Sequence, residues 1–252
     1  MPPHKPCADG PQAPQMECKL KRHTMFSAKT YAARRNMLRT KIGSGIILLP
    51  GNSLSPNNYP NNAYYFRQDS SFRYYFGLNT PSLAGLIDAD TGEEALYGDD
   101  FTVEDIIWTG PQPTLRELGA EVGVTATFPM AELEKRLRKA VSLGRKIHYL
   151  PPYRGETKLQ LSALLGIKPE LLHDYKSVEL MFAVAEMREK KSAEEVEAME
   201  RAFLIGYHMH TLAMHMCHPG VIEREIAGAI EGIAKSSGSG LSFPSIVSQH
   251  GE

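Results

Sequence analysis

Four histidines near the C-terminal end of the sequence are the first residues whose type and spacing could hold a metal ion: His208, His210, His215 and His218. Two imidazoles share one zinc ion most readily from positions i and i+4 of a helix, with a glutamate between them as base. None of these histidines has that spacing, and no glutamate lies between them. We therefore expect structural or surface roles for all four.

An acidic run could bind a divalent cation through oxygen ligands: Asp99, Asp100, Glu104 and Asp105. Its spacing does not match an EF-hand loop, so we expect a solvated acidic turn. Cys217 stands among the histidines, where a cysteine–histidine nucleophile is formally possible. No second feature supports that chemistry, and a buried free thiol is the favoured interpretation.

Two further stretches resemble ligand sites only superficially. Arg188, Lys190 and Lys191 could grip an anion, but they directly precede a helix-capping sequence and are expected to be solvated. Residues 236–242, SSGSGLS, lack the lysine and the preceding strand of a phosphate-binding loop, so they are predicted to be a linker. The residues by themselves therefore predict no catalytic group and no metal ligand.

The composition is that of a soluble globular protein. The chain has 252 residues, 42% of them hydrophobic and 23% charged, and a formal net charge of -1. This balance does not favour nucleic acid or an anionic membrane surface as a partner. No apolar run approaches the roughly 20 residues that span a bilayer. Cys7, Cys18 and Cys217 have no metal-ligand spacing, which indicates a reducing compartment, and we expect the cytoplasm.

Residues 1–24 are rich in proline and have no hydrophobic period, so a disordered extension is predicted. Helix and strand signals alternate through residues 25–175, which predicts an α/β domain. The hairpin pattern of residues 83–97 makes its sheet mixed. The aromatic stretch at 64–77 predicts a strand, a cap at Asp69 or Ser70, and a short helix that ends at Gly77. The other predicted elements are helices at 27–42, 113–121, 130–144 and 158–165 and strands at 46–49 and 147–150.

Residues 176–252 are mainly helical. Ser192 and Glu195 form a capping-box pattern, and apolar side chains spaced by three and four predict a helix that runs to about Cys217. A second helix follows over 222–233, and a strand begins at 243–247. An isolated strand cannot satisfy its backbone groups, so this segment is expected to be incomplete.

Four stretches resemble the aminopeptidase P family of the creatinase and prolidase group. They are residues 66–78 (FRQDSSFRYYFGL), 106–110 (IIWTG), 187–195 (MREKKSAEE), and 217–220 (CHPG) together with 243–247 (FPSIV). The resemblance implies a creatinase-like N-terminal domain over 25–175. Residues 176–252 would then be a linker helix and the truncated start of a "pita-bread" catalytic domain.

The resemblance implies a metalloaminopeptidase that removes an N-terminal residue preceding proline. Such enzymes use two divalent metal ions, often manganese, to activate a water molecule. Their ligands, two aspartates, one histidine and two glutamates, would lie beyond residue 247. We therefore expect no metal and no activity in this chain alone. In similar enzymes the tryptophan of the W-x-G stretch lies near the mouth of the active site, which makes Trp108 a candidate substrate contact, with a core position as the alternative.

Two other functions stay open. The resemblance also fits a prolidase, which cleaves only X-Pro dipeptides. A non-catalytic pita-bread relative that serves as a binding or oligomerisation module is the hypothesis from a different class. The expected partners are peptides with proline in the second position and further copies of the chain, since family members commonly self-associate and an incomplete second domain leaves apolar helix faces uncovered.

Overall fold

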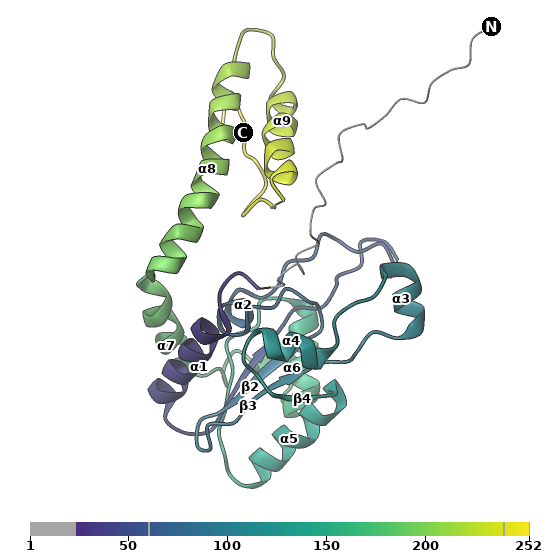
Figure 1. Cartoon of the computed structure of the whole chain (residues 1–252), viewed down its shortest axis with the longest axis vertical. Helices are drawn as coiled ribbons and strands as arrows, with labels where there is room; N and C mark the ends of the chain where they lie inside the picture. The colour runs from purple at the N-terminus through teal and green to yellow at the C-terminus, as the bar shows by residue number, and fades with distance from the viewer. Residues whose placement is uncertain (1–23, 60, 239, 252) are drawn as a thin grey trace, which may run out of the picture. The chain divides into compact units, whose positions relative to one another are not determined.

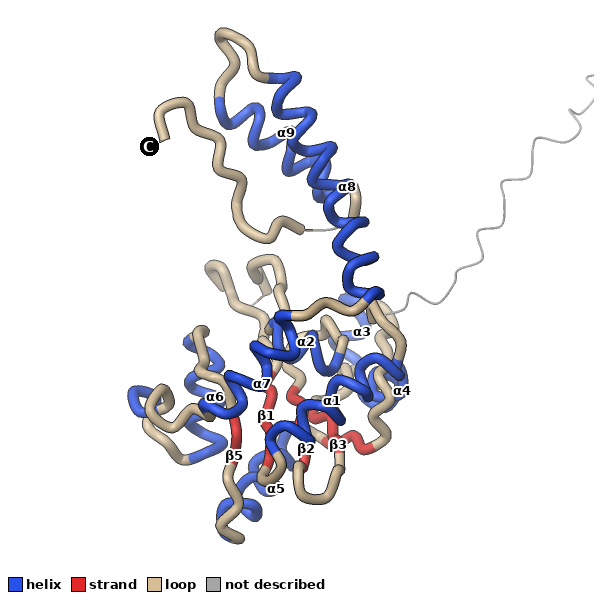
Figure 2. Tube along the Cα trace, turned by 90° about the vertical axis from the view of Figure 1, so that its left-hand side faces the viewer, coloured by secondary structure: helices blue, strands red, loops and turns tan. Residues whose placement is uncertain are grey.

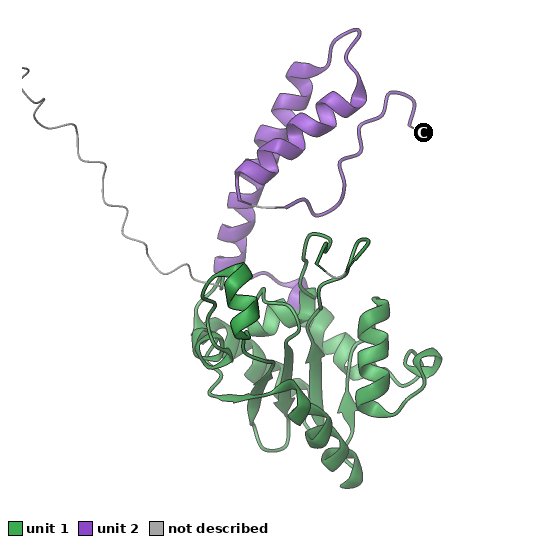
Figure 3. Cartoon of the chain, turned by 90° about the vertical axis from the view of Figure 1, so that its right-hand side faces the viewer, with its two compact units in different colours: residues 1–187 green, residues 188–252 purple. Residues whose placement is uncertain are grey.

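The computed structural model describes residues 24–59, 61–238 and 240–251 (Figure 1). The predicted extension at 1–24 lies almost wholly outside the described residues, as do Cys7 and Cys18. The chain divides into two compact units, residues 1–187 and residues 188–252 (Figure 3).

The first unit is built on a five-stranded sheet in the order β4-β3-β2-β1-β5. Strand β2 runs antiparallel to both of its neighbours, whereas β1 pairs with β5 and β3 pairs with β4 in parallel. The predicted mixed sheet and its hairpin are confirmed. Strand β4 was not predicted, because three residues are too few to show a strand pattern in the sequence; two of them are half-buried and Phe128 is exposed. The strands are β1 Ile46–Pro50, β2 Ala84–Asp88, β3 Glu94–Tyr97, β4 Ala126–Phe128 and β5 Ile147–His148.

Helices cover both faces of the sheet (Figure 2). Successive side chains of a strand point to opposite faces. In β1, Ile47 and Leu49 join the core cluster beneath α1, α2, α4 and α7, whereas Ile46 and Leu48 join the cluster beneath α5 and α6. The helices that begin in this unit are α1 Ala28–Ile42, α2 Ser70–Phe76, α3 Val103–Thr109, α4 Leu115–Glu121, α5 Met130–Ser142, α6 Gly155–Leu165 and α7 Val178–Glu189, with a 3-10 turn at Pro169–Leu171.

The aromatic stretch forms the predicted short helix α2. Asp69 Oδ1 accepts from the backbone N–H groups of Ser71 and Phe72, both at 2.9 Å. Gly77 ends the helix in the left-handed conformation with φ 69°, and a Cβ there would lie 2.3 Å from the Tyr31 ring. The predicted strand at 64–66 is wrong: those residues belong to a loop, in which Tyr65 is 86% exposed.

Helix α1 buries two arginines that its sequence places beside its apolar stripe. The Arg35 side chain is fully buried, with Nε 2.7 Å from Glu94 Oε2. Its Nη1 and Nη2 donate to the carbonyl oxygens of Tyr75 and Val122, each at 3.0 Å. These carbonyls lie at the C-terminal ends of α2 and α4, where the helix dipole is negative. Burial lowers the pKa of Arg35, and Glu94 opposes this shift.

The start of α4 and the division between the two units differ from expectation. Pro113 precedes the Thr114 cap of α4 instead of occupying its first turn. Helix α7 packs Leu180 and Val184 into the core of the first unit, so the division between the units falls after Met187 instead of near residue 175.

The second unit contains α8 Ala193–Met216 and α9 Glu223–Ser236, which pack against each other. The predicted capping box is present, since Glu195 N donates to Ser192 Oγ at 3.3 Å and Ser192 N donates to Glu195 Oε2 at 2.8 Å. The strand predicted at 243–247 is wrong; within the described part of this unit no strand lies beside that segment to share hydrogen bonds. None of the described helices combines the length and apolar character needed to cross a bilayer.

Candidate functional site at the carboxyl edge of the sheet

The carboxyl ends of four strands meet at one edge of the sheet. Strands β1, β3, β4 and β5 share one direction, because β2 is antiparallel to both β1 and β3. The connections at 51–69, 98–114 and 149–154 leave the sheet there. In open α/β sheets ligands bind outside the carboxyl ends of the strands, so this edge is the candidate functional surface.

The acidic run begins at this edge and caps two helices. Asp99 Oδ1 accepts from the N–H of Met130, the first residue of α5, at 3.1 Å. Asp100 Oδ1 accepts from the N–H of Leu115, the first residue of α4, at 2.6 Å. A carboxylate is stabilised at such a position by the helix dipole. Both side chains are exposed, as predicted for a solvated turn, and the structure adds the capping role.

Helix α3 is held together by its own hydrogen bonds. Asp105 Oδ2 accepts from the backbone N–H of Thr102 at 2.8 Å and from its hydroxyl at 2.6 Å. These bonds lower the pKa of Asp105. The Thr109 hydroxyl donates to the carbonyl of Asp105 at 2.8 Å. No residue of α3 is buried, so the helix keeps its shape without packing against the sheet.

Trp108 is 83% exposed on this helix, and Val103 and Ile107 are 77% and 75% exposed. Figure 1 shows α3 standing away from the sheet between two long connections. A core position for the chain's only tryptophan, the alternative considered from the sequence, is therefore wrong. The indole is presented to solvent at the carboxyl edge, where it can stack on a ring or an apolar group of a ligand.

A cleft of about 280 Å³ lies at the base of α3. Asp99, Asp100 and Asp105 contribute to its lining, together with apolar side chains that include Leu83 and Leu118. Carboxylates on one part of the wall and leucines on another suit a group that is cationic at one end and apolar at the other, such as the amino end of a peptide.

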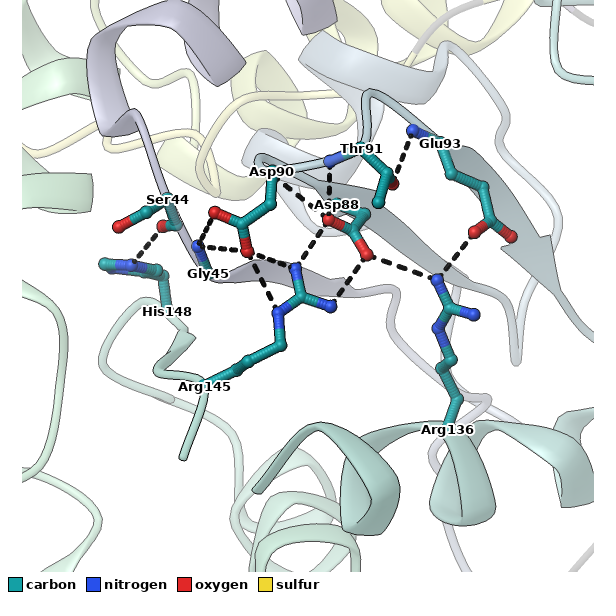
Figure 4. Close-up of polar contacts among 9 residues, drawn as sticks. All are labelled: Ser44, Gly45, Asp88, Asp90, Thr91, Glu93, Arg136, Arg145 and His148. Carbon is teal, nitrogen blue, oxygen red and sulfur yellow. Dashed lines mark hydrogen bonds and ion pairs between the residues drawn. The ribbon is translucent and has the colours of Figure 1, made fainter. Parts of the chain in front are cut away.

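The opposite edge of the sheet is closed by an ion-pair network (Figure 4). The Arg145 guanidinium pairs with Asp88 through Nη1–Oδ2 at 2.9 Å and Nη2–Oδ1 at 2.5 Å, and it also binds Asp90. Arg136 bridges Asp88 at 3.2 Å and Glu93 at 2.6 Å. Burial alone would raise the pKa of Asp88, but the hydrogen bonds from Arg145 and Thr91 outweigh it and lower that pKa to about 2. This network fixes the β2–β3 turn against the segment that precedes β5.

A buried histidine extends the same edge. His148 Nε2 lies 3.1 Å from the Ser44 carbonyl oxygen, and Nδ1 lies 2.7 Å from Ser177 Oγ. Ser177 in turn reaches Glu179 Oε2 at 3.1 Å, and Glu179 pairs with Lys146 at 2.9 Å. Burial and the charge of Lys146 lower the pKa of His148. The contacts hold the start of α7 to β5, which is a structural role.

Comparison with known proteins identifies the first unit. Residues 31–149 match the family described as aminopeptidase P, N-terminal domain. The Xaa-Pro aminopeptidase of Escherichia coli (strain K12) is 27% identical over 215 residues, which make up 81% of this chain and 48% of that protein. The first unit therefore contains a region that matches the aminopeptidase P N-terminal domain, in a chain that is similar to an Xaa-Pro aminopeptidase.

Solved aminopeptidase P structures share the fold. A histidine-to-alanine variant of the E. coli enzyme matches with a TM-score of 0.70, and the zinc-substituted enzyme in complex with product matches with a TM-score of 0.69. Each is 22% identical and covers 84% of this chain and 50% of its own chain. The predicted α/β class with a mixed sheet is confirmed by this likeness. The chain spans about half the length of the relatives it matches.

The four histidines of the second unit do not gather into a metal site. His208, His210, His215 and His218 are all exposed. Across residues 24–59, 61–238 and 240–251, no group of three or more histidine, cysteine, aspartate or glutamate side chains could hold a metal ion. The described residues therefore do not fit the two-metal centre that the family implies, and we derive no metal-dependent step from them.

The other candidates in the second unit also lie at the surface. Cys217 is exposed at the end of α8, so the expected buried thiol is wrong, because α8 has no buried residue and presents its last turn to solvent. Arg188, Lys190 and Lys191 are exposed, as predicted. Lys191 Nζ donates to the carbonyl oxygens of Arg188 and Glu189, at 2.5 and 3.1 Å, at the C-terminal end of α7.

No pattern in the sequence indicates the Asp88–Arg145 pair or the His148 contacts. Asp88 and Arg145 are 57 positions apart, and His148 and Ser177 are 29 apart. The hairpin pattern of residues 83–97 predicts the turn that follows Asp88, but it does not identify the arginine that Asp88 binds.

Proposed function

We propose that this chain is the N-terminal part of an Xaa-Pro aminopeptidase, a metal-dependent hydrolase that removes an N-terminal residue preceding proline. The observation that supports the proposal most is the aminopeptidase P N-terminal domain at residues 31–149, together with the 27% identity to the E. coli Xaa-Pro aminopeptidase. The substrates would be peptides with proline in the second position.

In this proposal Trp108 is a substrate contact. Leaving an indole 83% exposed forgoes the burial energy of a large aromatic side chain, which favours a binding role over a structural one. The capping box keeps α3 helical without packing, so the indole is presented on a preformed element. A flat indole face can stack against a proline ring.

The proposal assigns no catalytic residue and no metal ligand to this chain. Two divalent metal ions, with manganese expected, would be held by residues beyond 247 and would supply an activated water molecule. The proposed compartment is the cytoplasm, as the cysteine usage suggests.

Self-association is also proposed. Helix α8 exposes large apolar side chains, including Phe203 at 60%, Leu204 at 59% and Tyr207 at 64%. Contiguous apolar surface of this kind favours association. Sedimentation at moderate concentration should show a dimer or larger species, and a clean monomer would contradict this part of the proposal.

The decisive experiment measures hydrolysis of an Xaa-Pro-Xaa tripeptide by the 252-residue chain with added manganese, beside the complete product of the encoding gene. We expect activity in the longer product alone. Activity in the short chain would show that our interpretation of its histidines is wrong, and no activity in either would favour a binding module. Cleavage of X-Pro dipeptides without cleavage of tripeptides would indicate a prolidase.

A further inference from the structure

A second cleft at the carboxyl edge, about 270 Å³ in volume, lies beside the loop that follows β1. Its lining includes the aromatic residues Tyr64, Tyr65 and Phe66 and the basic residues Arg67 and Arg154. Tyr64 is 60% exposed and Tyr65 86% exposed. Ligand pockets for drug-sized molecules measure roughly 300–1,000 Å³, so this cleft is sized for part of a peptide.

Hydrogen bonds fix the conformation of the loop that forms the cleft. Tyr64 N donates to the Ser55 carbonyl at 2.9 Å, next to a bridge between Pro56 and Ala63. Arg154 Nη1 donates to the Ser53 carbonyl at 3.3 Å, which joins the loop to the segment that follows β5. The aromatic side chains are therefore mounted on a loop with defined anchors.

The side chains that line the cleft carry positive charge only. Arg67 and Arg154 are the charged residues of the lining, and no carboxylate is among its residues. Glu156 approaches Arg154 Nη2 at 3.4 Å and accepts from Ser55 Oγ at 2.7 Å, but it does not line the cleft. A guanidinium has five N–H donors, so contacts with Ser53 and Glu156 leave Arg154 able to bind a further anion.

We propose that this cleft binds the C-terminal end of short proline-containing peptides. The carboxylate would be held by Arg154 and Arg67, since guanidinium groups match carboxylates in charge and geometry. The proline ring would lie on the rings of Tyr64 and Tyr65, as extended proline-rich segments do on aromatic surfaces. The inference rests on the proposed function in naming peptides as the ligand.

The test is calorimetric titration of the 252-residue chain with Ala-Pro-Pro as the free acid, with its C-terminal amide, and with trialanine as the free acid. We expect the acid to bind about tenfold more tightly than the amide, because the amide loses a charge-assisted pair of hydrogen bonds. Trialanine should bind more weakly than Ala-Pro-Pro, since it offers no ring to the tyrosines. Equal affinity for acid and amide, or no binding of either, would overturn the proposal.

Variants locate the site. Arg154→Gln and Arg67→Gln should each weaken binding of the acid by about tenfold, and Tyr65→Ala should weaken Ala-Pro-Pro more than trialanine. Arg138→Gln and Tyr175→Ala are matched controls, since both residues are exposed and neither lines the cleft. Binding that all the cleft variants leave unchanged would place the ligand elsewhere and reject the inference. Because the titration needs no catalysis, it can succeed where the hydrolysis assay fails, and the two proposals are separable.

Discussion

The carboxylate of Asp88 and the guanidinium of Arg145 form a two-pronged ion pair across the end of the sheet opposite the candidate site, with Nη1–Oδ2 at 2.9 Å and Nη2–Oδ1 at 2.5 Å. The Asp88 side chain is 1% exposed, whereas that of Arg145 is 23% exposed. The carboxylate therefore depends on its partners for the solvation it has lost.

Arg145→Ala should lower the free energy of unfolding by about 3 kcal/mol, because it leaves a buried carboxylate short of its main cation. Urea denaturation measures the change. Arg138→Ala is the matched control: Arg138 pairs with Glu134 at 2.6 Å but is 71% exposed, and its loss should cost no more than about 0.5 kcal/mol. Equal effects of the two substitutions would contradict a special role for the buried pair.

Acid should weaken the first unit through Asp88. The pKa of Asp88 is lowered from 3.8 to about 2 in the folded protein, so its contribution is fully present above about pH 4 and is lost as the pH falls toward 2. A difference of this size corresponds to about 2 kcal/mol. Unfolding followed by denaturant between pH 5 and 2 should show the loss, and Asp88→Asn should be less stable at pH 5 but flatter in its pH dependence.

His148 should also lower the free energy of unfolding as the pH falls, but at a higher pH than Asp88 does. Its pKa is lowered by burial and by Lys146, so protonation is disfavoured in the folded state. The stability it contributes is full above its unfolded pKa of about 6.5 and declines as the pH falls below that value. The slope of unfolding free energy between pH 7 and 5 should shrink in His148→Gln, and an unchanged slope would assign the dependence to other groups.

Gly77 and Gly166 form a natural pair for testing steric fit. Both end a helix with positive φ, at 69° and 67°, but a Cβ at Gly77 would lie 2.3 Å from the Tyr31 ring, whereas nothing lies within 4 Å at Gly166. Gly166→Ala should cost about 1 kcal/mol for the left-handed backbone alone. Gly77→Ala should cost about 3 kcal/mol or more, because the Tyr31 ring must also move. Similar costs would show that the Tyr31 ring moves aside freely.

Replacing Trp108 should have little effect on stability but should reduce activity toward substrate. Its fluorescence should be that of a water-exposed indole and should be quenched by acrylamide, and no other tryptophan contributes to the signal. Trp108→Ala should change the free energy of unfolding by no more than about 0.5 kcal/mol. In the complete gene product the same substitution should lower kcat/KM for Xaa-Pro peptides, and an unchanged kcat/KM would remove Trp108 from the substrate contacts.

The local elements of the fold were predictable because their signals lie within a few residues. Asp69 and Gly77 bracket α2 as expected, and Ser192 with Glu195 opens α8. Caps of this kind satisfy backbone N–H groups one turn away, so the sequence alone specifies them. The strand expected at 243–247 is wrong because a strand depends on distant residues: it requires hydrogen-bonding partners that its own residues cannot supply.

The sequence by itself determined the α/β alternation, the hairpin and the family resemblance, because these depend on short patterns and on residue identity. Tertiary structure alone decided that Arg35 is buried between two helix ends, that Asp88 meets Arg145 and that Trp108 faces solvent. Each of these outcomes depends on which distant groups the packed sheet and helices bring within a few ångströms. Desolvation and charge pairing are set by that environment and not by neighbours in the chain.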